Sequence, residues 1–121
     1  MTGVKCILIV EDEPLTALDL RYACEDAGFD AVTVATSRKA LEAIAANDAI
    51  EGAVLDVNLG RGESSEAIAQ ILRDRNIPFV LNTGDRSANS ENLRGIEAPI
   101  ITKPSAAAEV VARLLEQLRP A

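Results

Sequence analysis

The feature that most constrains the fold of this chain is a regular alternation of short, apolar, β-branched runs with longer amphipathic segments. Such runs are typical of strands buried on both faces, and the segments between them repeat apolar residues at helical spacing. The predicted strands are residues 6–10, 31–35, 52–57, 79–82 and 100–102. Strands that alternate with helices form βαβ units with right-handed crossovers, so we predict an α/β protein with a parallel sheet covered on both faces.

Helix signals lie between the predicted strands. The first helix is expected to begin at Pro14 and end at Gly28, because proline is tolerated in a first helical turn and glycine favours the position after a helix. Thr36 or Ser37 is expected to cap the second helix. The side chains predicted to face the core from these two helices are Leu15, Leu18, Tyr22, Ala23, Leu41, Ile44 and Ala45.

Two further helices are predicted in the second half of the chain. One is expected to begin at Ser64 or Ser65, and the other is the last element. Residues 86–95 contain only Leu93 as a sizeable apolar residue, so a fourth helix there should be short or irregular. The inward side chains of the two well-marked helices are predicted to be Ile68, Ile71, Leu72, Ala107, Val110, Val111, Leu114, Leu115 and Leu118.

Length and charge narrow the class of protein. The 121 residues suit one domain, and 48% hydrophobic with 26% charged residues is a globular composition. The net charge of −7 and the lack of a basic cluster argue against a nucleic-acid partner and fit a cytoplasmic protein. The first apolar run is too short for a signal peptide or a membrane span. Cys6 and Cys24 have no metal-ligand spacing and no His to assist them, so they are expected to be buried hydrophobes.

Polar residues follow the predicted strands at the positions where a doubly wound sheet binds ligands. A sheet of order 2-1-3-4-5 binds outside the carboxyl ends of its strands, near the switch between strands 1 and 3. The acidic, hydroxyl and amine side chains at these strand ends are Glu11, Asp12, Asp56, Thr83 and Lys103. Strand 2, the expected edge strand, contributes none. The sequence therefore predicts one polar site at this edge of the sheet.

The chemistry of these side chains suits a phosphoryl group and a hard cation. Asp56 interrupts an apolar run, and a carboxylate in such a place needs a cation, dense hydrogen bonding or a strand end; taken alone it could equally cap a turn. Carboxylates that converge repel one another unless a cation lies between them, and oxygen donors favour Mg²⁺. Lys103 and Thr83 would complete an oxyanion-binding set, and Gly84 would allow close approach of the backbone.

Together these motifs resemble the receiver domain of two-component response regulators, over essentially the whole chain. The motifs are Glu11-Asp12, Asp56, Thr83-Gly84 and Lys103-Pro104, in the family's order and at about its spacing. The resemblance implies a flavodoxin-like fold and a single receiver domain over residues 1–121, similar to small stand-alone regulators of the chemotaxis-regulator type. A piece of a longer regulator is the alternative.

The resemblance also implies roles for individual residues. Asp56 would accept a phosphoryl group from a sensor histidine kinase or a histidine phosphotransfer protein. Asp12 would bind Mg²⁺ directly beside Asp56, Glu11 through water, and Asn58 through its backbone carbonyl. The set that would hold the phosphoryl oxygens is Thr83 and Lys103, and a cis peptide bond is implied before Pro104.

The expected function is a phosphorylation-dependent signalling switch that is not an enzyme beyond its own phosphotransfer and autodephosphorylation. Its output would pass to a protein partner through the region 86–118, as a monomer or a phosphorylation-dependent dimer, with no nucleic acid and no membrane. Similar proteins carry an aromatic residue where this chain has Ile101. The alternatives are a phosphate sink or phosphorylation-independent interaction module, and an aspartyl-phosphate hydrolase, which would need an acid where the chain has Asn58.

Overall fold

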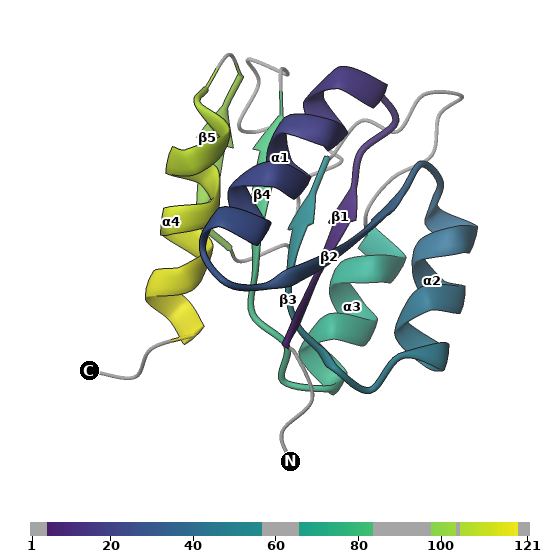
Figure 1. Cartoon of the computed structure of the whole chain (residues 1–121). Coiled ribbons are helices and arrows are strands. Elements are labelled where there is room, and N and C mark those ends of the chain that lie inside the picture. The colour runs from purple at the N-terminus through teal and green to yellow at the C-terminus, as the bar shows by residue number, and fades with distance from the viewer. Residues whose placement is uncertain (1–4, 57–65, 84–97, 104, 119–121) are drawn as a thin grey trace.

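The computed structural model describes residues 5–56, 66–83, 98–103 and 105–118. The strands of this part form one parallel sheet in the order β2-β1-β3-β4-β5, with β1 next to both β2 and β3 (Figure 1). Their bounds are β1 (Cys6–Val10), β2 (Asp30–Val34), β3 (Ile50–Leu55), β4 (Phe79–Thr83) and β5 (Ile100–Thr102). The predicted doubly wound order is therefore confirmed, and the reversal of strand order falls between β1 and β3.

Helices cover both faces of this sheet (Figure 1). Their bounds are α1 (Pro14–Asp26), α2 (Ser37–Ala46), α3 (Glu66–Asp74) and α4 (Ala107–Leu118). Side chains of α1 and α4 pack in one hydrophobic core with one face of the sheet, and those of α2 and α3 pack in a second core with the other face. The chain is thus a three-layer α/β structure whose sheet is buried between two cores.

Strand β1 shows how the two cores are divided. All five of its residues are buried, with Ile7 and Ile9 in the core under α1 and α4, and Leu8 and Val10 in the core under α2 and α3. This alternation follows from the two-residue period of a strand. Gly52 of β3 faces the core under α1 and α4. A Cβ atom added at this position would lie 3.2 Å from Cδ2 of Leu114 in α4. The absence of a side chain there lets α4 pack closely on the sheet.

Two helix ends follow the sequence signals. The Thr36 side chain accepts a hydrogen bond from the Lys39 backbone N–H at 3.1 Å, which makes Thr36 the N-cap of α2. After α1, Gly28 adopts a φ of +93° and its N–H bonds the carbonyl of Glu25, while the next N–H bonds the carbonyl of Cys24. These two bonds form a Schellman motif, so Gly28 ends α1 as predicted.

The predicted inward face of α1 is wrong for its large residues. Leu15, Leu18 and Tyr22 are 75%, 40% and 55% exposed, whereas the buried residues of the helix are Ala17, Leu20 and Cys24. Apolar residues occur at helical spacing on both of these faces, so the pattern alone did not choose between them. The packed face carries smaller residues, and α1 lies against α4 through it.

Smaller differences concern α2 and β3. Ala40 is buried in α2, whereas Ala45, which was predicted to face inward, is exposed. Strand β3 begins at Ile50, two residues before the prediction, and Asp56 lies just after its end.

The expected caps Ser64 and Ser65 and the expected irregular segment 86–95 lie outside the described residues. Among the helices of the described part, none is long and apolar enough to cross a lipid bilayer.

Candidate functional site

Strand ends bring the predicted acidic residues to one edge of the sheet. Val10 pairs with Leu55 in the register of β1 and β3, so Glu11 and Asp56 are the next residues along these neighbouring strands. The backbone N–H of Asp56 donates to the Val10 carbonyl at 2.9 Å, which holds the two strand ends together beyond the last paired residues. The carboxyl groups that the sequence separates by 45 positions are thereby neighbours.

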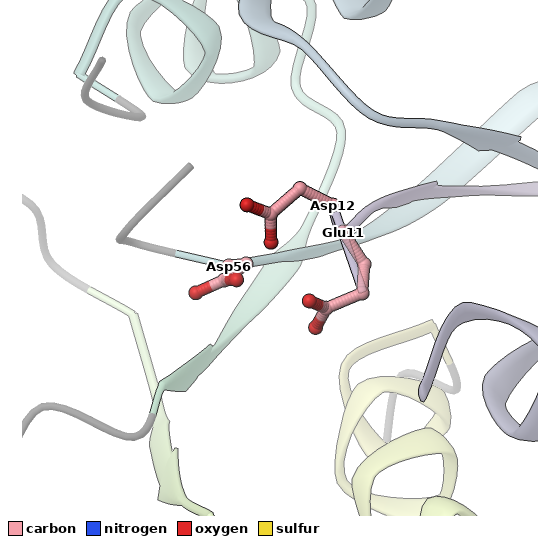
Figure 2. Close-up of side chains that lie close together, drawn as sticks. All are labelled: Glu11, Asp12 and Asp56. Atoms are coloured by element: carbon pink, nitrogen blue, oxygen red, sulfur yellow. The ribbon is translucent and has the colours of Figure 1, made fainter. Parts of the chain in front are cut away.

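Glu11, Asp12 and Asp56 form one acidic cluster. Each offers a carboxylate oxygen, and these oxygens all lie within 4.8 Å of one another. Figure 2 shows the three side chains converging on the same space beside the end of β3. Glu11 and Asp56 are 4% and 5% exposed, whereas Asp12 is exposed. Buried carboxylates at this separation repel strongly, so the cluster needs positive charge to remain ionised.

Lys103 supplies one positive charge to the cluster from the end of β5. Its Nζ donates to Glu11 Oε1 at 2.8 Å and lies 3.6 Å from Asp56 Oδ2. Burial disfavours the charged form of Lys103, but the hydrogen bond to Glu11 and the charge of Asp56 outweigh it, so the pKa of the ammonium group is raised. Lys103 is therefore a cation that bridges two buried carboxylates.

The Glu11 carboxyl group has a strongly raised pKa. Burial raises its pKa to about 7, the hydrogen bond from Lys103 opposes that rise, and the charge of Asp56 adds to it. Its other oxygen accepts a hydrogen bond from the Glu13 backbone N–H at 3.2 Å. One lysine therefore does not fully compensate the acidic cluster near neutral pH.

The donor set fits a hard divalent cation. The cluster consists only of carboxylate oxygens, which are ligands that Mg²⁺ prefers. At an effective dielectric constant of 20, two unit charges about 5 Å apart repel by about 3 kcal/mol, and a divalent ion among them would reverse the sign of that interaction. The residues present therefore suit the predicted magnesium site.

Other predicted site residues are described only in part. Thr83 is the last residue of β4, in register with Thr102 of β5, but its side chain lies outside the described part of the structure. Asn58, Gly84 and Pro104 lie outside it altogether, so the backbone ligand, the close approach at Gly84 and the cis peptide bond stay predictions. The structure brings together Glu11, Asp12, Asp56 and Lys103.

Asn82 is a buried polar residue near the same edge of the sheet that was not predicted from the sequence. Its side chain is 3% exposed, and its Oδ1 accepts a hydrogen bond from Ser105 Oγ at 3.3 Å. A signal was available, because Asn82 interrupts the apolar run of β4 in the same way as Asp56 interrupts that of β3. Both polar residues come at the carboxyl ends of central strands, where this fold class binds ligands.

Comparison with protein families identifies the class. Residues 7–115 match the family described as the response regulator receiver domain. That match covers most of the chain, so the chain belongs to the receiver domains of response regulators. Membership implies phosphorylation-dependent two-component signalling, and receiver domains typically bind Mg²⁺ at an acidic pocket such as the one formed here by Glu11, Asp12 and Asp56.

Individual relatives agree with this assignment. The chain is 32% identical over 114 residues to the phyllosphere-induced regulator PhyR of Methylorubrum extorquens, and 34% identical over 117 residues to the transcriptional regulatory protein TcrA of Mycobacterium tuberculosis. It aligns over 93% and 94% of its own length but covers only 43% and 46% of theirs. The chain thus spans about half the length of these curated relatives.

Solved structures of similar length show the same fold. The solution structure of SdrG from Sphingomonas melonis Fr1 is 39% identical, with a TM-score of 0.78 and coverage of 98% of both chains. A response regulator receiver protein from Sinorhizobium medicae WSM419 is 26% identical, with a TM-score of 0.83 and coverage of 96% of this chain and 95% of that one. The receiver fold therefore extends over nearly the whole chain.

Proposed function

We propose that this chain is a single receiver domain over residues 1–121 and acts as a switch that is phosphorylated on Asp56. The observation that carries the proposal is the buried carboxylate of Asp56 at the end of β3, held within 4.8 Å of two further carboxylates and 3.6 Å from Lys103 Nζ. A buried carboxylate beside a lysine and a cation-binding cluster is arranged to stabilise negative charge that gathers on a phosphoryl group. Family membership points to the same chemistry.

The phosphoryl donor is a phosphohistidine of a sensor histidine kinase or of a histidine phosphotransfer protein. A carboxylate oxygen of Asp56 forms the new bond to phosphorus while the bond from phosphorus to the imidazole nitrogen breaks. The electron pair of that bond stays on the imidazole, which takes up a proton. The products are an aspartyl phosphate and a neutral histidine, and later attack by water on phosphorus returns Asp56 and inorganic phosphate.

The chain's own residues prepare this transfer. Glu11, Asp12 and Asp56, together with the backbone carbonyl of Asn58, would hold Mg²⁺, which neutralises charge on the phosphoryl oxygens when it is bound. Lys103 is close enough to Asp56 to exchange its hydrogen bond with Glu11 for one with a phosphoryl oxygen. Thr83, at the end of β4, is the second proposed phosphoryl contact.

The departure of Lys103 from Glu11 would connect phosphorylation to the surface. Lys103 follows β5 and precedes α4 by only a few residues, so its movement bears on the segment that starts α4. We propose that an output protein reads the region 86–118. Phosphorylation would shift a population between two states of that surface, by an amount limited to the difference in contacts that the phosphoryl group makes in each state.

Incubation with acetyl phosphate tests the phosphoacceptor directly. With Mg²⁺, the intact mass should rise by one phosphoryl group on the wild type and on the exposed-site control Asp48→Asn, and should not rise on Asp56→Asn or with a chelator present. An equal mass gain on Asp56→Asn, or none on the wild type, would refute the proposal. Partner binding that Asp56→Asn leaves unchanged would favour a phosphorylation-independent module, and sustained turnover of a phosphomonoester would favour a hydrolase.

A further inference from the structure

Asn82 is buried, and neither of its amide N–H donors is paired within the described part of the chain. Its side chain is 3% exposed, and within the described part of the chain its amide bonds only through Oδ1, which accepts from Ser105 Oγ at 3.3 Å. The two N–H groups of its Nδ2 have no partner among those residues. Burying unpaired donors is unfavourable, so a buried group of this kind in a native structure calls for an explanation.

The sheet register places Asn82 beside Asp56. Leu55 of β3 pairs with Leu81 of β4, so Asp56 and Asn82 are the next residues along the two strands and leave the sheet on the same face. Strand β4 lies between β3 and β5. Ser105, which follows β5, donates to Oδ1 of the planar carboxamide, and Nδ2 is the other polar group of that amide.

Asn82 also shares a cavity with the lysine of the site. A cavity of about 400 Å³ is lined by Glu13, Thr16, Asn82, Lys103 and Ser105. The cavity adjoins the acidic cluster through Lys103, whose Nζ bonds Glu11. Asn82 therefore lines the same cavity as Lys103, whose Nζ is 3.6 Å from the Asp56 carboxylate that is proposed to receive the phosphoryl group.

We propose that Nδ2 of Asn82 donates a hydrogen bond to the phosphoryl group on Asp56, and that Ser105 positions the amide for this contact. The inference rests on the proposed function. A phosphoryl group on Asp56 adds charged oxygens near Asn82, whose Nδ2 bonds no acceptor among the residues that the structure describes. A hydrogen bond to a charged acceptor is stronger than one between neutral groups. The Asn82 donor therefore stabilises the phosphorylated protein, whereas its burial without a partner destabilises the unphosphorylated protein.

The test compares two measurements on the full chain. Beryllium fluoride serves as the phosphoryl mimic, and its affinity for the Mg²⁺-loaded protein is measured by calorimetric titration; the melting temperature is measured without Mg²⁺ or mimic. For Asn82→Leu we expect beryllium fluoride to bind about tenfold more weakly, with Mg²⁺ affinity unchanged and a melting temperature equal to or above that of the wild type. The melting temperature should not fall, because leucine has a volume similar to that of asparagine and buries no unpaired donor.

Two further variants separate positioning from general disturbance. Ser105→Ala should weaken beryllium fluoride binding by less than Asn82→Leu does, and combining the two should be no weaker than Asn82→Leu alone, because Ser105 acts through Asn82. Thr16→Val is the matched control, since Thr16 lines the same cavity but donates its hydroxyl to Glu13. That control should bind the mimic as the wild type does.

The outcomes distinguish this inference from the proposed function. If the wild type binds beryllium fluoride and Asn82→Leu binds it equally well, the inference is overturned while the proposed function stands. A lower melting temperature with unchanged mimic affinity would assign Asn82 a structural role instead. If Asn82→Leu does not fold, the smaller Asn82→Ala is judged on the same two measurements. A wild type that binds no mimic overturns both proposals.

Discussion

The pH dependence of stability offers a sharp test of the acidic cluster through Glu11→Gln. Burial raises the Glu11 pKa to about 7 from its ordinary value of 4.5. In the unfolded chain this carboxyl group loses its proton near its ordinary pKa, whereas the folded protein retains the proton up to about pH 7. The folded state thus binds more protons over this interval, so the contribution of Glu11 to stability is complete below the unfolded pKa and is lost as the pH rises through the folded one.

The size of this loss follows from the shift. Each unit of pKa difference corresponds to about 1.4 kcal/mol, so Glu11 should lower the free energy of unfolding by up to about 3 kcal/mol between pH 4.5 and pH 8. Glutamine has nearly the same shape and does not ionise. The difference in slope between the wild type and Glu11→Gln therefore isolates the titration of Glu11, which includes its ion pair with Lys103.

Urea unfolding followed by circular dichroism measures this slope. The wild type, Glu11→Gln and the surface control Glu42→Gln should be compared at pH 5, 6, 7 and 8 with a chelator present. Glu42 pairs with Arg38 in an exposed ion pair, so its loss should change stability little. Saturating Mg²⁺ should flatten the wild-type slope, because a bound cation favours the ionised carboxylate. Parallel curves for the wild type and Glu11→Gln would refute the reasoning about burial.

Three further predictions concern the fold and the switch. Leu20→Ala should cost about 2–5 kcal/mol of unfolding free energy whereas Leu15→Ala should stay within about 0.5 kcal/mol, and comparable losses in urea titrations would show that α1 packs on a different face. Thr36→Ala should cost about 1 kcal/mol through loss of the α2 cap, and a stability equal to wild type would argue against that hydrogen bond. Lys103→Ala should retain Mg²⁺ binding, but its affinity for the output partner should no longer change on phosphorylation. A change in partner affinity as large as that of the wild type would contradict the proposal that Lys103 connects Asp56 to the surface.

Most of the fold could be predicted from the pattern of hydrophobic residues. Parallel strands that are buried on both faces must be almost entirely apolar, so they stand out in the sequence. The strand order and the cap at Thr36 agree with the structure. The face of α1 could not be read in the same way. Leu15 and Leu18 are more hydrophobic than Ala17, yet α1 buries Ala17 and leaves both leucines exposed. The choice depends on how closely α1 approaches α4, which is a property of two helices together.

For the site, the sequence by itself determined which residues meet, because parallel strands deliver their carboxyl ends to one edge of the sheet. That is sufficient to place Glu11, Asp12, Asp56 and Lys103 together. Only the tertiary structure decided that Lys103 pairs with Glu11 at 2.8 Å and lies 3.6 Å from Asp56. It also decided that Asn82 comes beside Asp56 with amide donors that bond nothing in the described part of the chain. Such pairings depend on strand register and on how side chains fill the space above the sheet, and no local pattern encodes either.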